Sequence, residues 1–241
     1  MNRKIRKNGL TLTELVVVIA VAAVLLGISV PAVKKVIESF DQSAGPRSLI
    51  DAALTGARAL AAAHSAPAGI RFQRDRKGDF YMIFIVHKDV SSTYATEFVA
   101  VPNRRPIKLP ASVGVLAGTV QSDADLNDTN LMNAQTFSVV FSEQGQLIQF
   151  PVRVLNRDGV NDDSSRDPIF NTRANVDSGT AGMFYQDAGP GGLDEEDSIG
   201  SFYIYDPKRF AEIPANQRFT GYIRSLPKEF VNPHTGQLIG R

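Results

Sequence analysis

The sequence predicts an α+β fold in which a long N-terminal helix packs on an antiparallel β-sheet. Three observations predict it. Residues 10–33 form a long apolar run whose only charged residue is Glu14, and residues 33–64 keep apolar side chains on one helical face. From residue 70 onward, apolar and polar residues alternate, as in strands with one buried face. One helical segment followed by a series of hairpins is the order expected when a sheet covers a helix.

The composition of the chain excludes several classes of function before any motif is considered. The 241 residues are 43% hydrophobic and include 14 Phe, enough to bury a core. The chain has no Cys, which excludes a disulfide scaffold, a zinc–thiolate site and a Cys nucleophile. Its formal net charge of +1 argues against a protein that mainly binds nucleic acid phosphates, so no nucleic acid partner is expected.

The N-terminus has the charge pattern of a membrane-inserted segment. Residues 1–9 carry four cations and no acid, and they end at Gly9. Residues 10–33 would span about 36 Å as a helix, longer than a hydrocarbon core of about 30 Å. Because the cations precede the span, its N-terminus is expected in the cytoplasm and the rest of the chain outside. This predicts a single-pass membrane protein.

Two other interpretations of this segment compete with a retained membrane helix. A core helix of a soluble protein is disfavoured, because the apolar run is long and two-sided. An ordinary secretory signal cleaved after Ala32 would leave a secreted or anchored binding domain. Glu14 argues against that signal, since an acid costs about 2.5–3.5 kcal/mol at mid-membrane and less near the interface. The binding-domain alternative stays open.

The residues around Glu14 carry a resemblance to a known signal. In KNGLTLTELVVVIA, residues 7–20, a basic leader ends at Gly9, an apolar residue follows, and Glu14 comes five residues after the glycine. This pattern resembles the N-terminus of prepilins, the precursors of type IV pilins and type II secretion pseudopilins. The resemblance implies that prepilin peptidase cuts between Gly9 and Leu10 and methylates the new amine of Leu10. It extends to Pro31, where many members carry Pro, and departs at Leu10, where Phe is commoner.

The resemblance implies a pilin-like fold and a structural role rather than an enzymatic one, with no cofactor. The implied partners are prepilin peptidase, other pilin or pseudopilin subunits, an inner-membrane assembly platform and membrane lipid. Residues 10–33 would hold the subunit in the cell inner membrane, with its head in the periplasm or outside the cell, until it is drawn into a fibre. That fibre would be a type II secretion pseudopilus or a type IV pilus.

Glu14 and Pro31 are the residues expected to act in assembly. Cleavage creates an ammonium group at Leu10, about 6 Å along the helix from Glu14. A carboxylate in lipid is costly, and it is much less so when it faces the terminal amine of a neighbouring subunit, which is the pairing that the resemblance implies. A Glu14 that reaches the lipid headgroups is the alternative. Pro31 lacks an N–H and clashes with the carbonyl of Gly27, so the helix is expected to loosen at residues 27–31.

An amphipathic stalk helix is expected over residues 34–64, with a break near residues 45–46. Gly45 and Pro46 interrupt the pattern, and Pro46 suits the first turn of a second helical piece. The helix should end near His64, because the sequence SAPAG that follows cannot continue it. Its buried face is expected to consist of Ile50, Ala53, Leu54, Ala57, Leu60 and Ala61.

Residues 65–241 are expected to form a β-rich periplasmic head. Turn signals at residues 75–78 and 143–146 join candidate strands into hairpins. A loose resemblance to H-type minor pseudopilins rests on ALTGARALAAAHSAPAGIRF at residues 53–72 and VVFSEQGQLIQF at residues 139–150. The candidate strands are residues 70–74, 80–87, 96–101, 113–115, 136–142, 147–155, 201–206 and, more weakly, 219–224.

An acidic segment at residues 156–198 has no clear periodicity, which predicts a variable surface loop that contributes little to the core. Residues 156–163 place Asn and Asp oxygens around Gly159, as calcium loops do, although no EF-hand Glu follows. A solvated turn explains the same residues and is the preferred interpretation. The acidic run at residues 194–197 is interpreted as a solvated loop tip, with a partner-binding or metal patch as the alternative.

The remaining candidates predict no chemistry. His64, His87 and His234 lack metal-ligand spacing, and the sequence has no nucleophile elbow, phosphate loop or dinucleotide motif. We therefore expect no catalytic, cofactor-binding or metal-binding residue. The basic patch at residues 104–108 would suit DNA binding by a competence-type pilin, a role that the acidic segment opposes.

Overall fold

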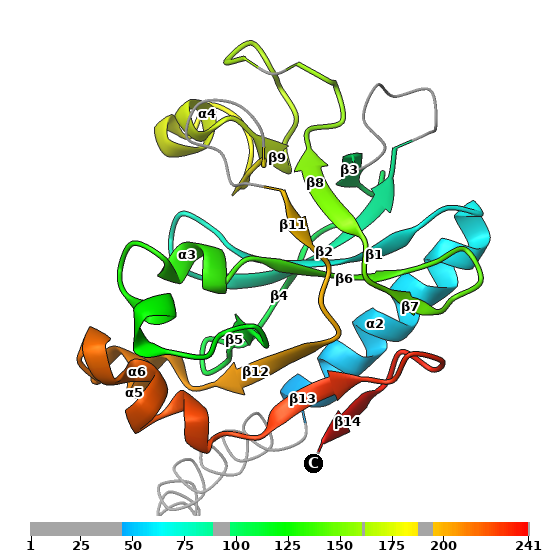
Figure 1. Cartoon of the computed structure of the whole chain (residues 1–241). Helices are drawn as coiled ribbons and strands as arrows, with labels where there is room; N and C mark the ends of the chain where they lie inside the picture. The colour runs from blue at the N-terminus through cyan, green and yellow to red at the C-terminus, as the bar shows by residue number, and fades with distance from the viewer. Residues whose placement is uncertain (1–44, 89–96, 161, 188–194, 241) are drawn as a thin grey trace, which may run out of the picture. The chain divides into compact units, whose positions relative to one another are not determined.

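The structure is a computed structural model of the chain (Figure 1). The chain divides into two compact units, Met1–Gly45 and Pro46–Arg241. Apart from Gly45, the described residues belong to the second unit, which is called the head below. The structure describes residues 45–88, 97–160, 162–187 and 195–240.

The predicted leader, the predicted membrane helix and the stalk up to residue 44 lie outside the described residues. The same holds for Gly9, Leu10, Glu14 and Pro31, so their expected roles stay predictions. No helix within the described ranges is long and apolar enough to cross a membrane.

The described chain begins with α2, Gly45–His64, which buries one apolar face. The helix ends where the sequence predicts. Ser65 adopts a positive φ of 49°, and the Ala66 N–H donates back to the Ala61 carbonyl. The predicted buried face is confirmed, and Pro46 in the first turn joins it. The buried residues are Pro46, Ile50, Ala53, Leu54, Ala57, Leu60 and Ala61.

The main sheet has eight strands in the order β11-β8-β3-β2-β1-β6-β7, with β4 paired to β2. Most of these strands coincide with predicted ones. The exceptions are β4 and β11, and the predicted strand at residues 147–155 is interrupted at residues 149–150. The strands are β1 Ala68–Arg74, β2 Phe80–His87, β3 Glu97–Ala100, β4 Ile107–Lys108, β6 Phe137–Phe141, β7 Leu147–Ile148, β8 Pro151–Leu155 and β11 Glu196–Asp197.

The main sheet is mixed because β7 and β8, almost continuous in the chain, pair with opposite edges of a four-strand set. The strands β3, β2, β1 and β6 pair antiparallel in that order, so β3 and β6 run in opposite directions. A stretch of chain that pairs with both β3 and β6 must therefore run antiparallel to one of them and parallel to the other. Accordingly β7 is antiparallel to β6, and β8 is parallel to β3. The sheet therefore curls, and the expected wholly antiparallel sheet is wrong at this pair.

A second sheet has the antiparallel order β14-β13-β12-β5, and β9 and β10 form a short parallel pair. The sequence did not predict β9, β10, β13 or β14. These strands are β5 Gly114–Ala117, β9 Phe170–Asn171, β10 Phe184–Tyr185, β12 Ser201–Tyr205, β13 Lys228–Val231 and β14 Leu238–Gly240. The shorter helices are η1 Asp123–Leu126, α3 Leu131–Ala134, α4 Arg173–Ser178, α5 Pro207–Ala211, η2 Ala215–Gln217, α6 Arg218–Gly221 and η3 Ile223–Ser225.

The weak strand expected at residues 219–224 is wrong, because α6 and η3 occupy this stretch. The Asp123 carboxylate explains the difference. It accepts hydrogen bonds from the N–H groups of Phe219 and Thr220 at 2.6 and 3.2 Å, and from the Thr220 hydroxyl at 2.8 Å. This acceptor lies about a hundred positions earlier in the chain, so local periodicity could not reveal the turn that it holds.

The strands divide their apolar side chains between two cores. On β2, Phe84 belongs to the core beneath α2, whereas its neighbour Ile85 belongs to a second core on the other face. Phe170 and Phe184, from the acidic segment, belong to this second core and are 0% and 1% exposed. The expectation that the segment contributes little to the core is therefore wrong.

Candidate functional site

A buried ion pair attaches residues 156–187, called the docked segment below, to the main sheet. Arg71 on β1 is 2% exposed, and the Asp187 side chain is fully buried. One Asp187 oxygen accepts from Arg71 Nη2, and the other accepts from the Val154 N–H at 2.7 Å. The Asp187 N–H donates back to the Val154 carbonyl at 2.8 Å, and Arg71 Nη1 lies 3.4 Å from the Ser138 hydroxyl. These contacts fix the end of the docked segment on the sheet.

Burial raises the pKa of Asp187 to about 6. The Arg71 guanidinium and the Val154 N–H act in the opposite direction, because both favour the charged carboxylate. The pair is therefore ionised at neutral pH. Perturbed carboxyl groups gather at functional sites, but structural ion pairs perturb them too. Since the Asp187 oxygens already accept from Arg71 and Val154, we assign this pair a structural role.

Sequence reasoning missed this pair. Arg71 stands between Ile70 and Phe72 in an alternating strand, where a charged residue is expected to face solvent. Asp187 is 116 positions away and lies in a segment that the sequence predicts to be a surface loop. No local signal connects the two residues, because their proximity follows from the docking of the segment.

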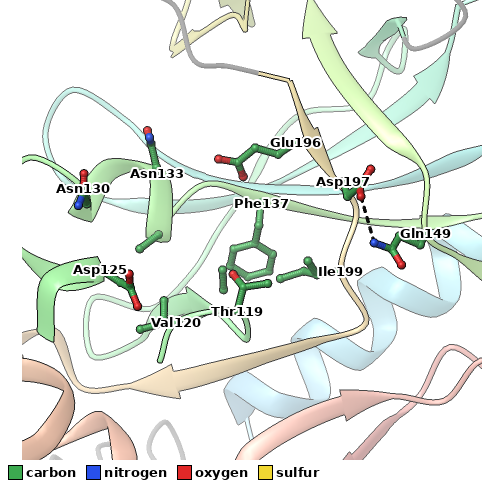
Figure 2. A pocket seen from close by; sticks show the side chains of 12 residues that line it. Thr119, Val120, Asp125, Asn130, Asn133, Phe137, Gln149, Glu196, Asp197 and Ile199 are labelled. Atoms are coloured by element: carbon green, nitrogen blue, oxygen red, sulfur yellow. Dashed lines mark hydrogen bonds between the residues drawn. The ribbon is translucent and has the colours of Figure 1, made fainter. Parts of the chain in front are cut away.

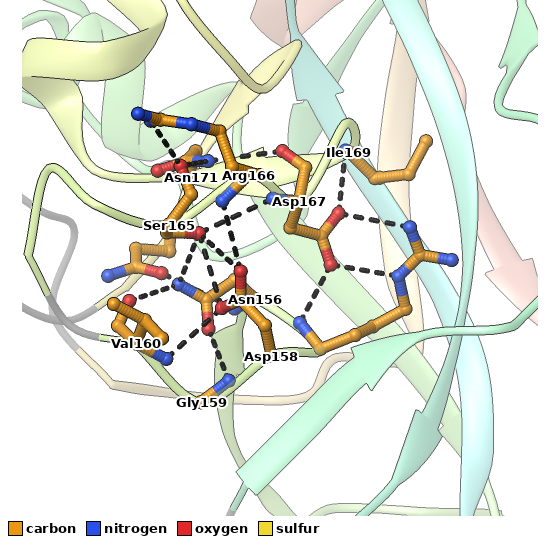
Figure 3. A network of polar contacts seen from close by, with 11 residues as sticks. Asn156, Asp158, Gly159, Val160, Ser165, Arg166, Asp167, Ile169 and Asn171 are labelled. Carbon is orange, nitrogen blue, oxygen red and sulfur yellow. Dashed lines mark hydrogen bonds and ion pairs between the residues drawn. The ribbon is translucent and has the colours of Figure 1, made fainter.

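The docked segment is held internally by hydrogen bonds around two carboxylates (Figure 3). Asp158 accepts from the Ser165 hydroxyl at 2.9 Å and from the Arg166 N–H at 3.1 Å. Asp167 accepts from the backbone N–H and the Nε–H of Arg157 at 2.7 and 2.8 Å. These hydrogen bonds connect residues 157–158 with residues 165–167. They give a stretch of chain with few apolar residues a defined shape.

The candidate calcium loop spans residues 156–163, of which residue 161 lies outside the described residues. The described part of the loop forms a hydrogen-bonded turn. Burial alone would raise the pKa of Asp158, but hydrogen bonds from the backbone and from the Ser165 hydroxyl lower it. Its oxygens therefore already have donors. Within the described ranges, no group of three or more His, Cys, Asp or Glu side chains could hold a metal ion. These hydrogen bonds account for the shape of the described part of the loop, and that the loop binds no calcium stays a prediction.

A hollow of about 500 Å³, called the acidic hollow below, opens between η1, α3, β6 and β11 (Figure 2). Its floor is apolar and includes the buried side chains of Val120 and Phe137. Three carboxylates line it, those of Asp125, Glu196 and Asp197. Of the described residues that line the hollow, none is Lys, Arg or His. Its lining thus joins negative charge to an apolar surface.

Two of these carboxylates are held in place. Asp125 Oδ2 accepts from the N–H groups of Gln121 and Ser122, both at 2.9 Å. Hydrogen bonds, that from Gln121 first, lower the pKa of Asp125 against the opposing effect of burial. Asp197 accepts from Gln149 Nε2 at 3.0 Å, as Figure 2 shows. The hollow is therefore negatively charged at neutral pH and partly preorganised.

The acidic run at residues 194–197 supplies two of the three carboxylates. Residue 194 lies outside the described residues. Glu196 and Asp197 are exposed and form β11, which pairs with β8 at the edge of the main sheet. The described part of the run is thus an edge strand rather than a loop tip, which corrects the preferred interpretation.

The structure places the three histidines in different surroundings. His64 is exposed at the end of α2, and His234 is exposed in the turn between β13 and β14. His87 ends β2 and meets the ring of Phe98 edge-on, with centroids 5.3 Å apart. That the histidines serve no common site stays a prediction.

The basic patch at residues 104–108 is engaged within the head. The Arg104 guanidinium lies over the Phe84 ring, 4.4 Å from its centroid. Lys108 Nζ pairs with Asp79 at 2.6 Å. These contacts leave less positive charge available for an anionic partner than the sequence alone indicates.

Comparison with known protein families gives a match at the N-terminus of the chain. Residues 4–30 match the family model of the prokaryotic N-terminal methylation motif. The chain carries a prepilin signature. The prepilin signature contains Gly9, Leu10 and Glu14, and Pro31 follows directly after it.

The prepilin signature confirms the resemblance to type IV pilins and pseudopilins. It marks a structural, pilin-like family and indicates a subunit that prepilin peptidase processes. It also implies assembly with other pilin subunits. No curated protein and no solved structure matches the chain.

Proposed function

We infer that this chain is a pseudopilin or minor pilin, a subunit of a type II secretion pseudopilus or a type IV pilus. The observation that carries this inference is the prepilin signature at residues 4–30. Prepilin peptidase cuts between Gly9 and Leu10 and methylates the new amine. The mature subunit then takes part in protein secretion or in pilus assembly.

Before assembly, residues 10–33 hold the subunit in the inner membrane as a single helix. Their length as a helix, about 36 Å, is sufficient for a hydrocarbon core of about 30 Å. The basic leader stays in the cytoplasm until it is removed, and the head lies in the periplasm or outside the cell. An assembly platform in the inner membrane then draws the subunit into the fibre.

Glu14 directs the docking of a new subunit. In the membrane its carboxylate lacks water, so the free energy of the assembled state falls when it meets a positive group. The methylated amine at Leu10 of a neighbouring subunit supplies that group. Pro31 loosens the helix over residues 27–31, which lets the helix adapt to its neighbours in the fibre.

The head supports a division of labour along the chain. The apolar face of α2 is buried against the main sheet, so it is used inside the subunit. Packing between subunits in the fibre core therefore falls to the apolar run at residues 10–33. The exposed surface of the head is left for contacts along the outside of the fibre.

Intact mass of the membrane-bound protein tests this function. The chain is produced with prepilin peptidase, extracted from membranes and measured, and we expect a start at Leu10 with one added methyl group. The variant Gly9→Val should keep its leader, because the residue before the cut is changed. A mass that corresponds to a start near Val33 would overturn the proposal, since it indicates an ordinary signal peptide and a released or anchored binding domain.

A further inference from the structure

We propose that two side chains of α2, those of Arg47 and Asp51, cap the edge of β14 and prevent a second copy of the chain from adding a strand there. The cap is an inhibitory contact within the head, and the proposal does not depend on the proposed filament function. It rests on the hydrogen bonds of Leu238, on the place of β14 in its sheet and on the apolar side chains beside it.

The strand β14 is the outermost strand of the second sheet and pairs only with β13 in that sheet. The Asn232 N–H donates to the Gln237 carbonyl at 2.8 Å, and the next residue, Leu238, stands opposite Val231. Because bonded and non-bonded pairs alternate along an antiparallel ladder, Leu238 turns its N–H and its carbonyl away from β13. An edge that presents such groups is a template for another strand.

Both outward groups of Leu238 are bonded to α2. The Leu238 N–H donates to Asp51 Oδ1 at 2.6 Å, and Arg47 Nη2 donates to the Leu238 carbonyl at 3.3 Å. The two side chains are four positions apart, so they lie on one face of the helix. Arg47 Nη2 also pairs with Glu229 of β13 at 3.0 Å. The helix, which lies beside the β13–β14 hairpin in Figure 1, thus offers one acceptor and one donor, as a neighbouring strand does.

The outer face of the same hairpin favours association. Among the described residues, the exposed large apolar side chains are Phe230 and Ile239, which are 40% and 45% exposed and stand opposite each other on β13 and β14. If Leu238 of one copy paired with Gly240 of another, the two Ile239 side chains would face each other across an antiparallel pair, about 4.5–5.5 Å apart at Cβ. Exposed apolar surface beside an open edge promotes such pairing, and the cap occupies the backbone groups that it needs.

Disulfide trapping in the full processed chain in dodecyl maltoside tests the proposal, because the chain has no Cys of its own. The substitution Ile239→Cys places one thiol on β14, copper phenanthroline oxidises thiols that meet, and dimers are quantified on a non-reducing gel. With the cap intact we expect few dimers. Adding Arg47→Ala and Asp51→Ala removes the donor and the acceptor, and dimer formation should rise about tenfold, the effect of losing two hydrogen bonds.

Arg58→Met is the matched control, since Arg58 is another α2 side chain that binds a backbone carbonyl, that of Gly145 at 2.8 Å, outside β14. In the thiol-bearing chain it should leave dimer formation unchanged. Asp51→Asn keeps the oxygen that accepts from β14 and should also form few dimers. A thiol introduced instead by Ala211→Cys, at the exposed end of α5, reports collisions of whole molecules, and the cap variants should not change its dimers.

Hydrogen exchange of peptides that contain Leu238 separates release of the edge from its pairing. Exchange should be faster in the double variant at low protein concentration, while thermal melting stays a single transition. Unchanged exchange, faster exchange without more dimers, or an equal rise in dimers at both thiol positions would overturn the proposal. If the double variant melts without cooperativity, Asp51→Ala compared with Asp51→Asn decides, and equal dimer formation by these two variants overturns the cap.

Discussion

Arg71 and Asp187 form an ion pair that is almost fully withdrawn from water. Removing two charges from water costs several kcal/mol for each ion, and their attraction repays this only when their remaining polar atoms are satisfied. Here the Val154 N–H completes the carboxylate, while Arg71 Nε has no hydrogen-bond partner among the described residues. The pair therefore adds less stability than its burial implies, and its clearest effect is to fix where the docked segment meets β1.

The raised pKa of Asp187 predicts a pH dependence of stability. The pKa is about 6 in the folded head, against about 3.9 in an unfolded chain. The folded state therefore binds this proton more tightly. The contribution of the group to the free energy of unfolding is present below pH 4 and is lost as pH rises to about 6. We expect the difference between the unchanged protein and Asp187→Asn to fall by about 2–3 kcal/mol over this window, measured by denaturant unfolding.

Asp125→Asn is the control of opposite sign. The pKa of Asp125 is lowered in the folded head, so its contribution is present above the unfolded pKa and is lost as pH falls. The difference between the unchanged protein and Asp125→Asn should therefore rise with pH. A difference for Asp187→Asn that is flat from pH 4 to pH 6, or that rises, would contradict the assignment of Asp187 as a desolvated carboxyl.

At the scale of elements, the docked segment is an integral part of the head. Its polar network gives it shape, its ion pair fixes one end, and two of its phenylalanines complete the second core. A segment with few apolar residues can thus be well ordered when the few are buried and the polar groups bond to one another. This is why its composition was a poor guide to its structure.

Phe184→Ala tests the integration of the docked segment. Phe184 is 1% exposed and contacts the rings of Tyr81 and Phe170. Its truncation should lower the free energy of unfolding by about 3–5 kcal/mol, with a single cooperative transition. The matched control is Phe230→Ala on β13, where the ring is 40% exposed, and we expect a clearly smaller loss. Equal losses from the two variants would mean that the segment is an appendage.

Elements that depend on local pattern were predictable. The buried face of α2 follows from the spacing of its apolar residues, and the β1–β2 hairpin follows from alternation around a turn. The parallel pairing of β3 with β8 was not predictable. It arises because the chain segment that contains β7 and β8 pairs with β6 at one edge and with β3 at the other. The helical turn at residues 219–224 was missed for a similar reason, since its acceptor, Asp123, is distant in the chain.

At the scale of the whole molecule, the proposed cleavage after Gly9 changes the net charge of the protein. The precursor has a net charge of +1, and cleavage after Gly9 removes four cations and no acid, which leaves −3. The mature subunit is therefore mildly acidic, and its acidic hollow and acidic segment lie in the head.

The role of Glu14 predicts a separation of processing from assembly. In Glu14→Gln the peptidase still finds Gly9 and an apolar residue after it, so we expect intact mass to show the same cleaved and methylated chain. The uncharged amide cannot pair with the amine of a neighbour, and the sheared filament fraction should contain at least about tenfold less subunit, the loss expected for about 1.4 kcal/mol. Glu143→Gln, a head acid, should assemble normally. Normal assembly of Glu14→Gln would contradict the pairing.

The amino-acid sequence by itself determined the prepilin signature, the apolar run at residues 10–33 and the buried face of α2. Each is written within a few dozen consecutive residues, where spacing, charge order and periodicity act directly. The tertiary structure decided the curl of the main sheet, the burial of Arg71 against Asp187, and the gathering of three carboxylates over an apolar floor. These features join residues far apart in the chain, and their energies depend on burial, which exists only once the chain has folded.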